Sequence, residues 1–256
     1  MKTITIIKVG GAIVEDEVSL NQLLDRFAQV EGPKILVHGG GRRATKVATE
    51  LGVESKMVEG RRITDSSMLE VVTMVYGGLV NKGIVARLQA RGVNALGLTG
   101  ADADVIRSHK RPLKNGIDYG FVGDVEHVRA GLLLNLLQQG IVPVVAPLTH
   151  DGQGNLLNTN ADTMASETAK ALASSASVTL VYCFEKLGVL RDPNDDNSVI
   201  PIITHADFER LTADGTISGG MKPKVENALA AVSAGVHRVI ITQASAVGQE
   251  GGTIIE

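Results

Sequence analysis

The chain has 256 residues, which suffice for one large domain or two small ones with an ample hydrophobic core. Hydrophobic residues make up 44% of the sequence, aromatic residues only 3%, and 29 positions are glycine, a composition typical of an α/β protein rich in turns. The formal net charge of −3 argues against the basic surface that binding to nucleic acid or an anionic membrane requires.

The sequence carries no sign of membrane insertion or export. Its longest apolar run falls short of a membrane span, and a strand predicted from residue 3 leaves no room for a signal peptide. Cys183 is the only cysteine, so an internal disulfide is impossible and we expect a cytoplasmic location. The six histidines are scattered without the spacing of a zinc site.

The first predicted strand, residues 3–9, is an almost uninterrupted apolar run, the pattern of a strand buried on both faces of a parallel sheet. Lys8 interrupts that run near its carboxyl end, and Gly10 and Gly11 follow directly. Ligands of open α/β sheets bind at this end of the strands, and a lysine beside bare glycine amides suits phosphate. The alternative is a lysine that extends into solvent beside an ordinary turn.

A second glycine turn follows a helix predicted over residues 18–30. The strand 34–37 runs into His38-Gly39-Gly40-Gly41 and then a helix predicted over residues 42–51. Free amides and the positive end of the helix dipole make such a junction an anion site, and a tight turn without a ligand is the alternative. The same four residues occur as the oxyanion loop of esterases, but the sequence lacks the G-x-S-x-G motif that such a hydrolase needs.

Two adjacent arginines follow a short strand predicted over residues 56–59. Arg61 and Arg62 suit a substrate carboxylate, which an arginine can bind bidentately. Because neighbours in a strand point to opposite faces, we expect one of them in a site and the other at the surface.

A charged hairpin is predicted in the middle of the chain. Alternating residues at 104–108 and 118–127 flank Lys114-Asn115-Gly116, a turn sequence typical of β-hairpins. The charges along it fit a lid over a polar substrate and equally well a solvated hairpin. The elements predicted around it are helices at 66–76, 79–91 and 128–139, the first two separated by Gly77-Gly78, and strands at 93–98 and 141–147.

Amide and carboxylate side chains gather at the next strand-to-helix junction. Asn158, Asn160 and Asp162 are spaced by two, which places several polar groups on one side of the turn. Asn160 is the best candidate for capping the helix predicted to run to residue 173. Asp162 has a second possible role, holding nearby lysines in place by its charge.

A second lysine stands out near the carboxyl end. Lys224 lies in the first turn of a helix predicted over residues 221–234, where a cation opposes the helix dipole. A phosphate bound at the same helix end explains that position. The other elements predicted here are strands at 177–182, 236–242 and 251–255, and a loop at 184–198.

The glycine turns, Lys8, Lys224 and Asp162 together favour phosphoryl transfer, because that chemistry depends on positioning and charge stabilisation. The sequence has neither a P-loop motif nor a G-x-G-x-x-G motif after a strand, so neither a P-loop nor a Rossmann site is supported. The residues alone leave two functions open, a phosphotransferase and a non-catalytic binder of an anionic metabolite.

The same motifs, taken in order, resemble the amino acid kinase superfamily and, within it, the N-acetylglutamate kinase family. The resemblance runs from the first strand to the last core strand, and several motifs in one order are more specific than any alone. They are Lys8-Val9-Gly10-Gly11, His38-Gly39-Gly40-Gly41, Gly60-x-Arg62-x-Thr64, Asn158-x-Asn160-Ala161-Asp162 and Gly219-Gly220-Met221-x-x-Lys224-Val225.

The resemblance implies an α/β three-layer sandwich with a largely parallel central sheet of about eight strands. It implies an acylglutamate-binding lobe with the dimer interface over residues 1–175 and an ATP-binding lobe over residues 176–256, within one continuous sheet. The implied reaction is the ATP-dependent phosphorylation of the γ-carboxylate of N-acetyl-L-glutamate in arginine biosynthesis. Mg²⁺ arrives with the nucleotide, and no metal ligand is expected in the protein.

The resemblance also assigns roles to individual residues. A carboxylate nucleophile is already ionised at pH 7, so no catalytic histidine is expected. Lys8 and Lys224 would stabilise the phosphoryl group in flight, Asp162 would orient both lysines, Gly10, Gly11, Gly40 and Gly41 would bind phosphate and substrate through their amides, and Arg62 and Asn158 would hold the substrate's carboxylates.

Three segments depart from the family pattern. Phe184-Glu185-Lys186-Leu187-Gly188 stands where the family usually has Thr-Asp-Val-x-Gly, Lys222 replaces an apolar residue, and residues 101–114 differ from expectation. Cations in that last segment and at Arg61 suggest the hypothesis that the acyl group carries its own charge, as N-succinyl does.

Two expectations concern assembly and regulation. Arginine-inhibited members of the family resemble hexamers linked by an extra amino-terminal helix, whereas this sequence begins at the first strand, so we expect a homodimer without arginine feedback. The alternative to an enzyme is a non-catalytic sensor of an amino acid or nucleotide on the same fold. The presence of Lys8, Lys224 and Asp162 together favours the enzyme.

Overall fold

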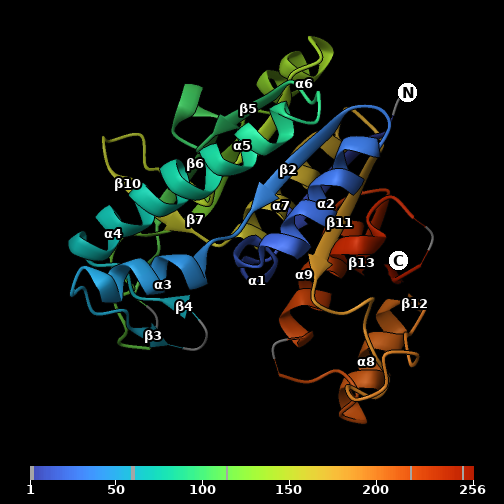
Figure 1. Cartoon of the computed structure of the whole chain (residues 1–256). Helices are drawn as coiled ribbons and strands as arrows, with labels where there is room; N and C mark the ends of the chain where they lie inside the picture. The colour runs from blue at the N-terminus through green and yellow to red at the C-terminus, as the bar shows by residue number, and fades with distance from the viewer. Residues whose placement is uncertain (1–2, 59–60, 114, 220, 250) are drawn as a thin grey trace.

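A computed structural model describes residues 3–58, 61–113, 115–219, 221–249 and 251–256, so Gly60, Lys114 and Gly220 of the predicted motifs lie outside the described residues. Its centre is an eight-stranded sheet in the order β12-β14-β13-β11-β1-β2-β8-β5 (Figure 1). The strands of this sheet are β1 (Ile4–Val9), β2 (Lys34–His38), β5 (Ala95–Leu98), β8 (Val142–Val145), β11 (Val178–Phe184), β12 (Ile202–Ile203), β13 (Arg238–Gln243) and β14 (Thr253–Ile255).

Most neighbours in the sheet are parallel, and only β14 pairs antiparallel, with β13. The strand β1 lies between β11 and β2, with Lys8 in register with Tyr182 and Val37. It is buried because its apolar residues cover both faces, as the continuous run in the sequence predicts.

Helices cover both faces of the sheet, and each face has its own apolar core. Ile4 and Ile6 of β1 pack in the core beneath α6, α7 and α9, whereas Ile7 and Val9 pack in the core beneath α2 to α5. The helices are α1 (Gly11–Glu15), α2 (Glu17–Gln29), α3 (Gly41–Glu50), α4 (Ser66–Val72), α5 (Asn81–Gln89), α6 (Ala130–Gln138), α7 (Ala161–Ala173), α8 (His205–Ala213) and α9 (Met221–Ser233). Figure 1 shows α2 and α7 on opposite sides of the sheet, and the predicted three-layer sandwich is confirmed.

The predicted break at Gly77-Gly78 is wrong. The π-helix η1 (Thr73–Val80) joins α4 to α5 without interruption. Val75, Tyr76 and Val80 of this stretch are buried in the core beneath α2 to α5, so tertiary packing outweighs the low helix propensity of glycine. Within the described residues, Ser66–Gln89 is the one helical stretch long and apolar enough to cross a membrane, and 44% of its most apolar window is buried inside the protein.

The predicted hairpin is confirmed as β6 (Ile106–Lys110) and β7 (Val122–Val128), which pair antiparallel. With β9 (Leu148–His150) and β10 (Leu156–Thr159) they form a small closed barrel beside the main sheet. A separate two-stranded sheet pairs β3 (Met57–Val58) with β4 (Arg61–Arg62), and the short 3₁₀ turns are η2 (Asp102–Asp104) and η3 (Ala244–Ala246).

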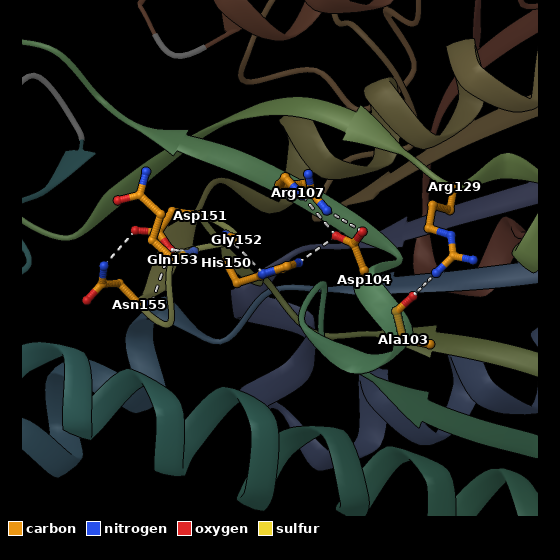
Figure 2. Close-up of polar contacts among 9 residues, drawn as sticks. All are labelled: Ala103, Asp104, Arg107, Arg129, His150, Asp151, Gly152, Gln153 and Asn155. Carbon is orange, nitrogen blue, oxygen red and sulfur yellow. Dashed lines mark hydrogen bonds and ion pairs between the residues drawn. The ribbon is translucent and has the colours of Figure 1, made fainter.

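A polar cluster fastens the loop before β6 to β9 (Figure 2). Asp104 accepts hydrogen bonds from His150 Nε2 at 2.8 Å and from Arg107 Nε at 3.1 Å, and the Arg107 contact holds the pKa of Asp104 below its usual value. Ala103 and Asp104 have φ near +50°, a conformation that is costly without glycine, and Arg129 donates to the Ala103 carbonyl at 2.6 Å. Charges of the hairpin thus pair with one another at this end of the barrel.

Other local differences are small. The predicted loop after Gly11 contains the short helix α1, and β11 extends through Phe184 rather than ending at Tyr182. The main sheet runs without interruption through both predicted lobes, because β1 pairs directly with β11. The division at residue 175 stays a prediction.

Candidate active site

The core of the site is an ion pair between β1 and α7. Lys8 projects from the face of β1 that carries Ile4 and Ile6, the face covered by α7 and α9. Its Nζ atom lies 2.7 Å from Oδ1 of Asp162, and the lysine is only 6% exposed. A buried cation requires such a partner, so the predicted contact between Asp162 and a lysine is present for Lys8.

Helix α7 begins where the sequence predicts. The side chain of Asn160 accepts a hydrogen bond from Thr163 N at 3.0 Å, which confirms Asn160 as the cap. The cap leaves Asp162 in the first helical turn, where a carboxylate is favoured by the helix dipole. The hydroxyl of Tyr182 on β11 donates to the Asp162 backbone carbonyl at 3.3 Å and fixes that turn against the sheet.

The two glycine turns lie directly against each other. A Cβ atom placed on Gly11 would be 3.5 Å from Gly41 N and 3.6 Å from Gly40 N, and one on Gly39 would be 3.1 Å from Gly11 N. Their backbone amides therefore converge on one place at the ends of β1 and β2. The first amides of α3 have no partner within the helix, an arrangement that suits an anion.

The ring of Tyr76 packs so closely against Gly40 that it leaves little room for a side chain there. A Cβ atom at Gly40 would lie 2.9 Å from Cδ1 of the Tyr76 ring, too close for any larger residue. Tyr76 belongs to η1 and is buried, and burial raises the pKa of its hydroxyl, an effect that the nearby Arg62 guanidinium opposes. The tyrosine ring thus forms a wall behind the second glycine turn.

Arg62 is buried and Arg61 is exposed, as the alternation of a strand predicts. Nη2 of Arg62 donates to the Gly41 carbonyl and to Thr45 Oγ1, both at 2.9 Å, and Nη1 donates to the Ser55 hydroxyl. These partners fix the guanidinium at the first turn of α3.

Asn158 lies on β10, next to the turn that leads into α7. Its side-chain amide donates to Thr64 Oγ1 at 2.9 Å, which joins the barrel to the segment carrying Arg62. An asparagine side chain has a second N–H and a carbonyl oxygen besides the group used in this bond, and these suit a polar ligand.

Lys224 approaches from the opposite side, in the first turn of α9. It is half-buried, and burial together with the charge of Lys8 lowers the pKa of its ammonium group. Its Nζ atom lies 3.8 Å from the ring centroid of Phe184 at the end of β11.

All nine predicted site residues line one cavity of about 430 Å³. They come from both ends of the chain and meet where β1, β2 and β11 end. They are Lys8, Gly10, Gly11, Gly40, Gly41, Arg62, Asn158, Asp162 and Lys224.

The sequence did not point to several residues that line the cavity. Nothing in the sequence marks Tyr76 as a site residue, because it is one of many apolar residues in a helical stretch. Phe184 was noticed only as a departure from the family pattern, and its ring faces both lysines. Among the described residues 101–113, Arg111 lines the cavity, where Asp124 neutralises it through contacts from Nε and Nη2.

Among the described residues, no group of three or more His, Cys, Asp or Glu side chains is arranged to hold a metal ion. Two lysine ammonium groups, one carboxylate and two sets of backbone amides surround one cavity, a combination that suits a phosphorylated ligand. Fold and site together define the class: an open α/β protein that handles phosphate at the carboxyl ends of its central strands.

The comparison with known proteins agrees with that class. Residues 3–243 match the model of the amino acid kinase family, and the chain belongs to this family. It is 68% identical to the acetylglutamate kinase of Bacteroides fragilis, over 99% of this chain and 97% of that protein, and 64% identical to the acetylglutamate kinase of Parabacteroides distasonis, over 99% of both.

The fold is shared with solved structures. The chain superimposes on N-acetylglutamate synthase from Neisseria gonorrhoeae with a TM-score of 0.84, at 22% identity, over 99% of this chain and 59% of that one. At that identity the likeness concerns the fold alone. The predicted fold class, with its largely parallel central sheet, is therefore confirmed.

Proposed function

We propose that the protein is an acetylglutamate kinase, which transfers the γ-phosphoryl group of MgATP to the γ-carboxylate of N-acetyl-L-glutamate in arginine biosynthesis. The observation that carries the proposal is the convergence of Lys8, Asp162 and Lys224 on one cavity beside the two glycine turns. The near full-length relatives that bear the same name support it.

The reaction needs positioning more than acid–base chemistry. A γ-carboxylate oxygen attacks the γ-phosphorus, a new carboxyl O–P bond forms, and the bond from phosphorus to the β,γ-bridging oxygen breaks, so ADP leaves with both bonding electrons. The carboxylate is ionised at neutral pH and carries no proton to remove. The barrier that remains is charge repulsion and alignment, which fixed cations and amides lower.

Each cation has a place in this scheme. Lys8 and Lys224 approach the cavity from β1 and α9, so their ammonium groups can balance the charge of the phosphoryl group from two sides. Asp162 holds the Lys8 ammonium at 2.7 Å and keeps the net charge of the pair low until the nucleotide arrives. The amides of Gly11, Gly40 and Gly41 donate hydrogen bonds to the phosphate oxygens, whereas the amide of Gly10 already donates to the Cys183 carbonyl at 3.2 Å.

Arg62 and Asn158 bind the other carboxylate of the substrate. Both are fixed by protein groups, Arg62 on α3 and Asn158 on Thr64. We infer that acylglutamate binds on the side of β2 and α3, within residues 1–175, and MgATP on the side of β11 and α9, within residues 176–256.

The two alternative functions are not favoured. The hypothesis of a succinylated substrate needs spare positive charge, and the cavity contains Arg61 and Arg111, but Asp124 already neutralises Arg111. A non-catalytic sensor has no need for both lysines and Asp162, and the similar curated proteins are named as kinases.

The protein as a homodimer is the second part of the proposal. Met74 and Leu79 on η1 are 54% and 53% exposed, unusual for large apolar side chains on the most apolar helical stretch, and a second copy would cover them. Sedimentation of a Leu79→Glu variant tests this, since it should be monomeric where the unchanged protein is dimeric. A cytoplasmic location stays a prediction.

The direct test is ADP release with MgATP, with N-acetylglutamate, N-succinylglutamate, free glutamate and aspartate offered side by side. Turnover with N-acetylglutamate above all others is expected. Preference for the succinyl compound would change the substrate, and turnover of a free amino acid would move the enzyme to a sibling activity. No turnover, despite thermal stabilisation by one of the compounds, would make the sensor the better interpretation.

A further inference from the structure

Phe184 occupies a place in the cavity that the proposed chemistry does not yet explain. It is the last residue of β11, the strand next to β1, and packs against the same core as Tyr182, on the face of the sheet that carries Lys8. Its Cδ1 atom is 3.9 Å from where a Cβ atom on Gly10 would lie. The ring therefore adjoins the first glycine turn as well as the lysines.

Both lysine ammonium groups lie over this ring. Nζ of Lys224 is 3.8 Å from the ring centroid, and Nζ of Lys8 is 5.2 Å from it. Both distances are within the range of a cation–π interaction, in which the negative face of the ring attracts a cation. The ring of Tyr182 stacks parallel to that of Phe184, with centroids 6.0 Å apart, and limits its rotation.

Lys224 needs such a contact more than Lys8 does. Lys8 has Asp162 at 2.7 Å, whereas no salt bridge joins Lys224 to any residue in the described part of the chain. Lys224 also sits in the first turn of α9, where the helix dipole opposes a cation. Burial, which is the largest effect, and the charge of Lys8 lower the pKa of the Lys224 ammonium group, whereas the charges of Asp162 and Glu185 raise it. The net shift is downward, so the charged form is disfavoured and gains from the contact with the ring.

We propose that Phe184 is a positioning residue, whose ring face holds the ammonium group of Lys224, and more weakly that of Lys8, in place for phosphoryl transfer. The inference rests on the proposed kinase function. The ring acts before the nucleotide binds: it keeps Lys224 charged and directed into the cavity instead of toward solvent. Once phosphate is present, its oxygens take over as partners of both ammonium groups.

A merely space-filling role for Phe184 makes different predictions. Leucine fills similar volume without a π face, and tyrosine keeps the face. We expect Phe184→Leu to lower kcat roughly fivefold to thirtyfold, which corresponds to about 1–2 kcal/mol of lost cation–π attraction. We expect Phe184→Tyr to stay within about twofold, and KM for the acylglutamate to change little in either variant.

The electronic character of the ring can be varied without changing its shape. Replacement of Phe184 by mono-, di- and trifluorinated phenylalanine weakens the negative face stepwise, and log kcat should fall with each fluorine. Because Lys224 must be protonated to act, the alkaline limb of the kcat profile should move to lower pH along the same series and in Phe184→Leu.

A measurement without substrates separates this inference from the proposed function. The pKa of the Lys224 ammonium group can be followed by NMR titration of the lysine side-chain nitrogen in the free protein. It should be lower in Phe184→Leu than in the unchanged protein and nearly unchanged in Phe184→Tyr. This result is expected even if the substrate of the enzyme is a different carboxylic acid.

Two results would overturn the inference. One is equal kcat in Phe184→Leu and the unchanged protein. The other is an equal loss in Phe184→Leu and Phe184→Tyr, with no trend along the fluorinated series and no change in the pKa of Lys224, which would make the ring a spacer only. Absence of turnover in the unchanged protein would instead count against the proposed kinase function.

Discussion

Oδ1 of Asp162 lies 2.7 Å from Nζ of Lys8, although Asp162 is in the first turn of α7 and Lys8 is near the carboxyl end of β1. The contact joins the strand at the middle of the sheet to the helix that covers it. The Asp162 carboxylate also acts on Lys224. Its negative charge raises the pKa of the Lys224 ammonium group, whereas burial lowers that pKa. Asp162 thus serves two cations at once.

Asp162→Asn removes this shared charge and keeps the shape of the side chain. The two ammonium groups then repel each other without compensation, and we expect kcat to fall about tenfold to a hundredfold, a barrier increase of about 1.4–2.7 kcal/mol. KM for MgATP should change less, because the added positive charge also attracts the nucleotide. Steady-state kinetics measure both, and an unchanged kcat would remove Asp162 from the mechanism.

Gly40→Ala tests the packing of the second glycine turn. The added methyl group meets the Tyr76 ring at 2.9 Å, so the turn or the ring must move, and we expect a loss of about 1–3 kcal/mol of unfolding free energy with a raised KM for acylglutamate. Gly131→Ala is the matched control, since its methyl group on α6 meets nothing within 4 Å. Denaturant titration should show this control about 0.5–1 kcal/mol more stable.

Arg62→Lys tests the proposed carboxylate contact. A lysine cannot reproduce the planar fork that reaches the Gly41 carbonyl, Thr45 and Ser55. We expect KM for acylglutamate to rise about tenfold or more, with KM for MgATP nearly unchanged, as for a lost charge-assisted hydrogen bond of about 1.5–3 kcal/mol. Arg61→Lys, at the exposed neighbour, is the control; equal effects of the two variants would contradict the assignment.

His38 should make the fold sensitive to acid. Its Nδ1–H donates to the Gly39 carbonyl at 2.8 Å, its Nε2 accepts from the Asn81 amide at 3.1 Å, and burial lowers its pKa from 6.5 to about 4. The folded state favours the neutral ring, so the stabilisation is complete above pH 6.5 and is lost as the pH falls toward 4. The loss amounts to about 3 kcal/mol.

The measurement is the unfolding free energy from pH 7.5 to 4, compared between the unchanged protein and His38→Asn. The variant should be less stable at neutral pH and should lack the part of the pH dependence that belongs to the histidine. Parallel curves for the two proteins would show that His38 does not titrate in this range.

Local signals in the sequence predicted the buried first strand, the two glycine turns beside it and the Asn160 cap, because each depends on residues close together in the chain. Its match to a known family supplied the assembly of these parts into one site. The continuous helix through Gly77-Gly78 was not predictable, since its stability comes from packing against the sheet rather than from propensity.

Contacts between elements far apart in the chain were also not predictable from the sequence. The fit of Tyr76 against Gly40 and the ring of Phe184 over Lys224 depend on the exact depth at which helices sit on the sheet. No spacing or motif encodes such a depth. Neither residue has a side chain that suggests phosphate chemistry by itself, so a search for reactive groups passes over both.

The position of β1 between β11 and β2 has a consequence for motion. Lys8 sits on a strand that is hydrogen-bonded on both edges, so any opening of the cavity has to take place around it. The lysine is a fixed point, and substrates are brought to it by the turns and helix ends at the rim. In hydrogen exchange, the amides of β1 should therefore keep the same protection with and without ligands, while those at the start of α3 and α9 become slower.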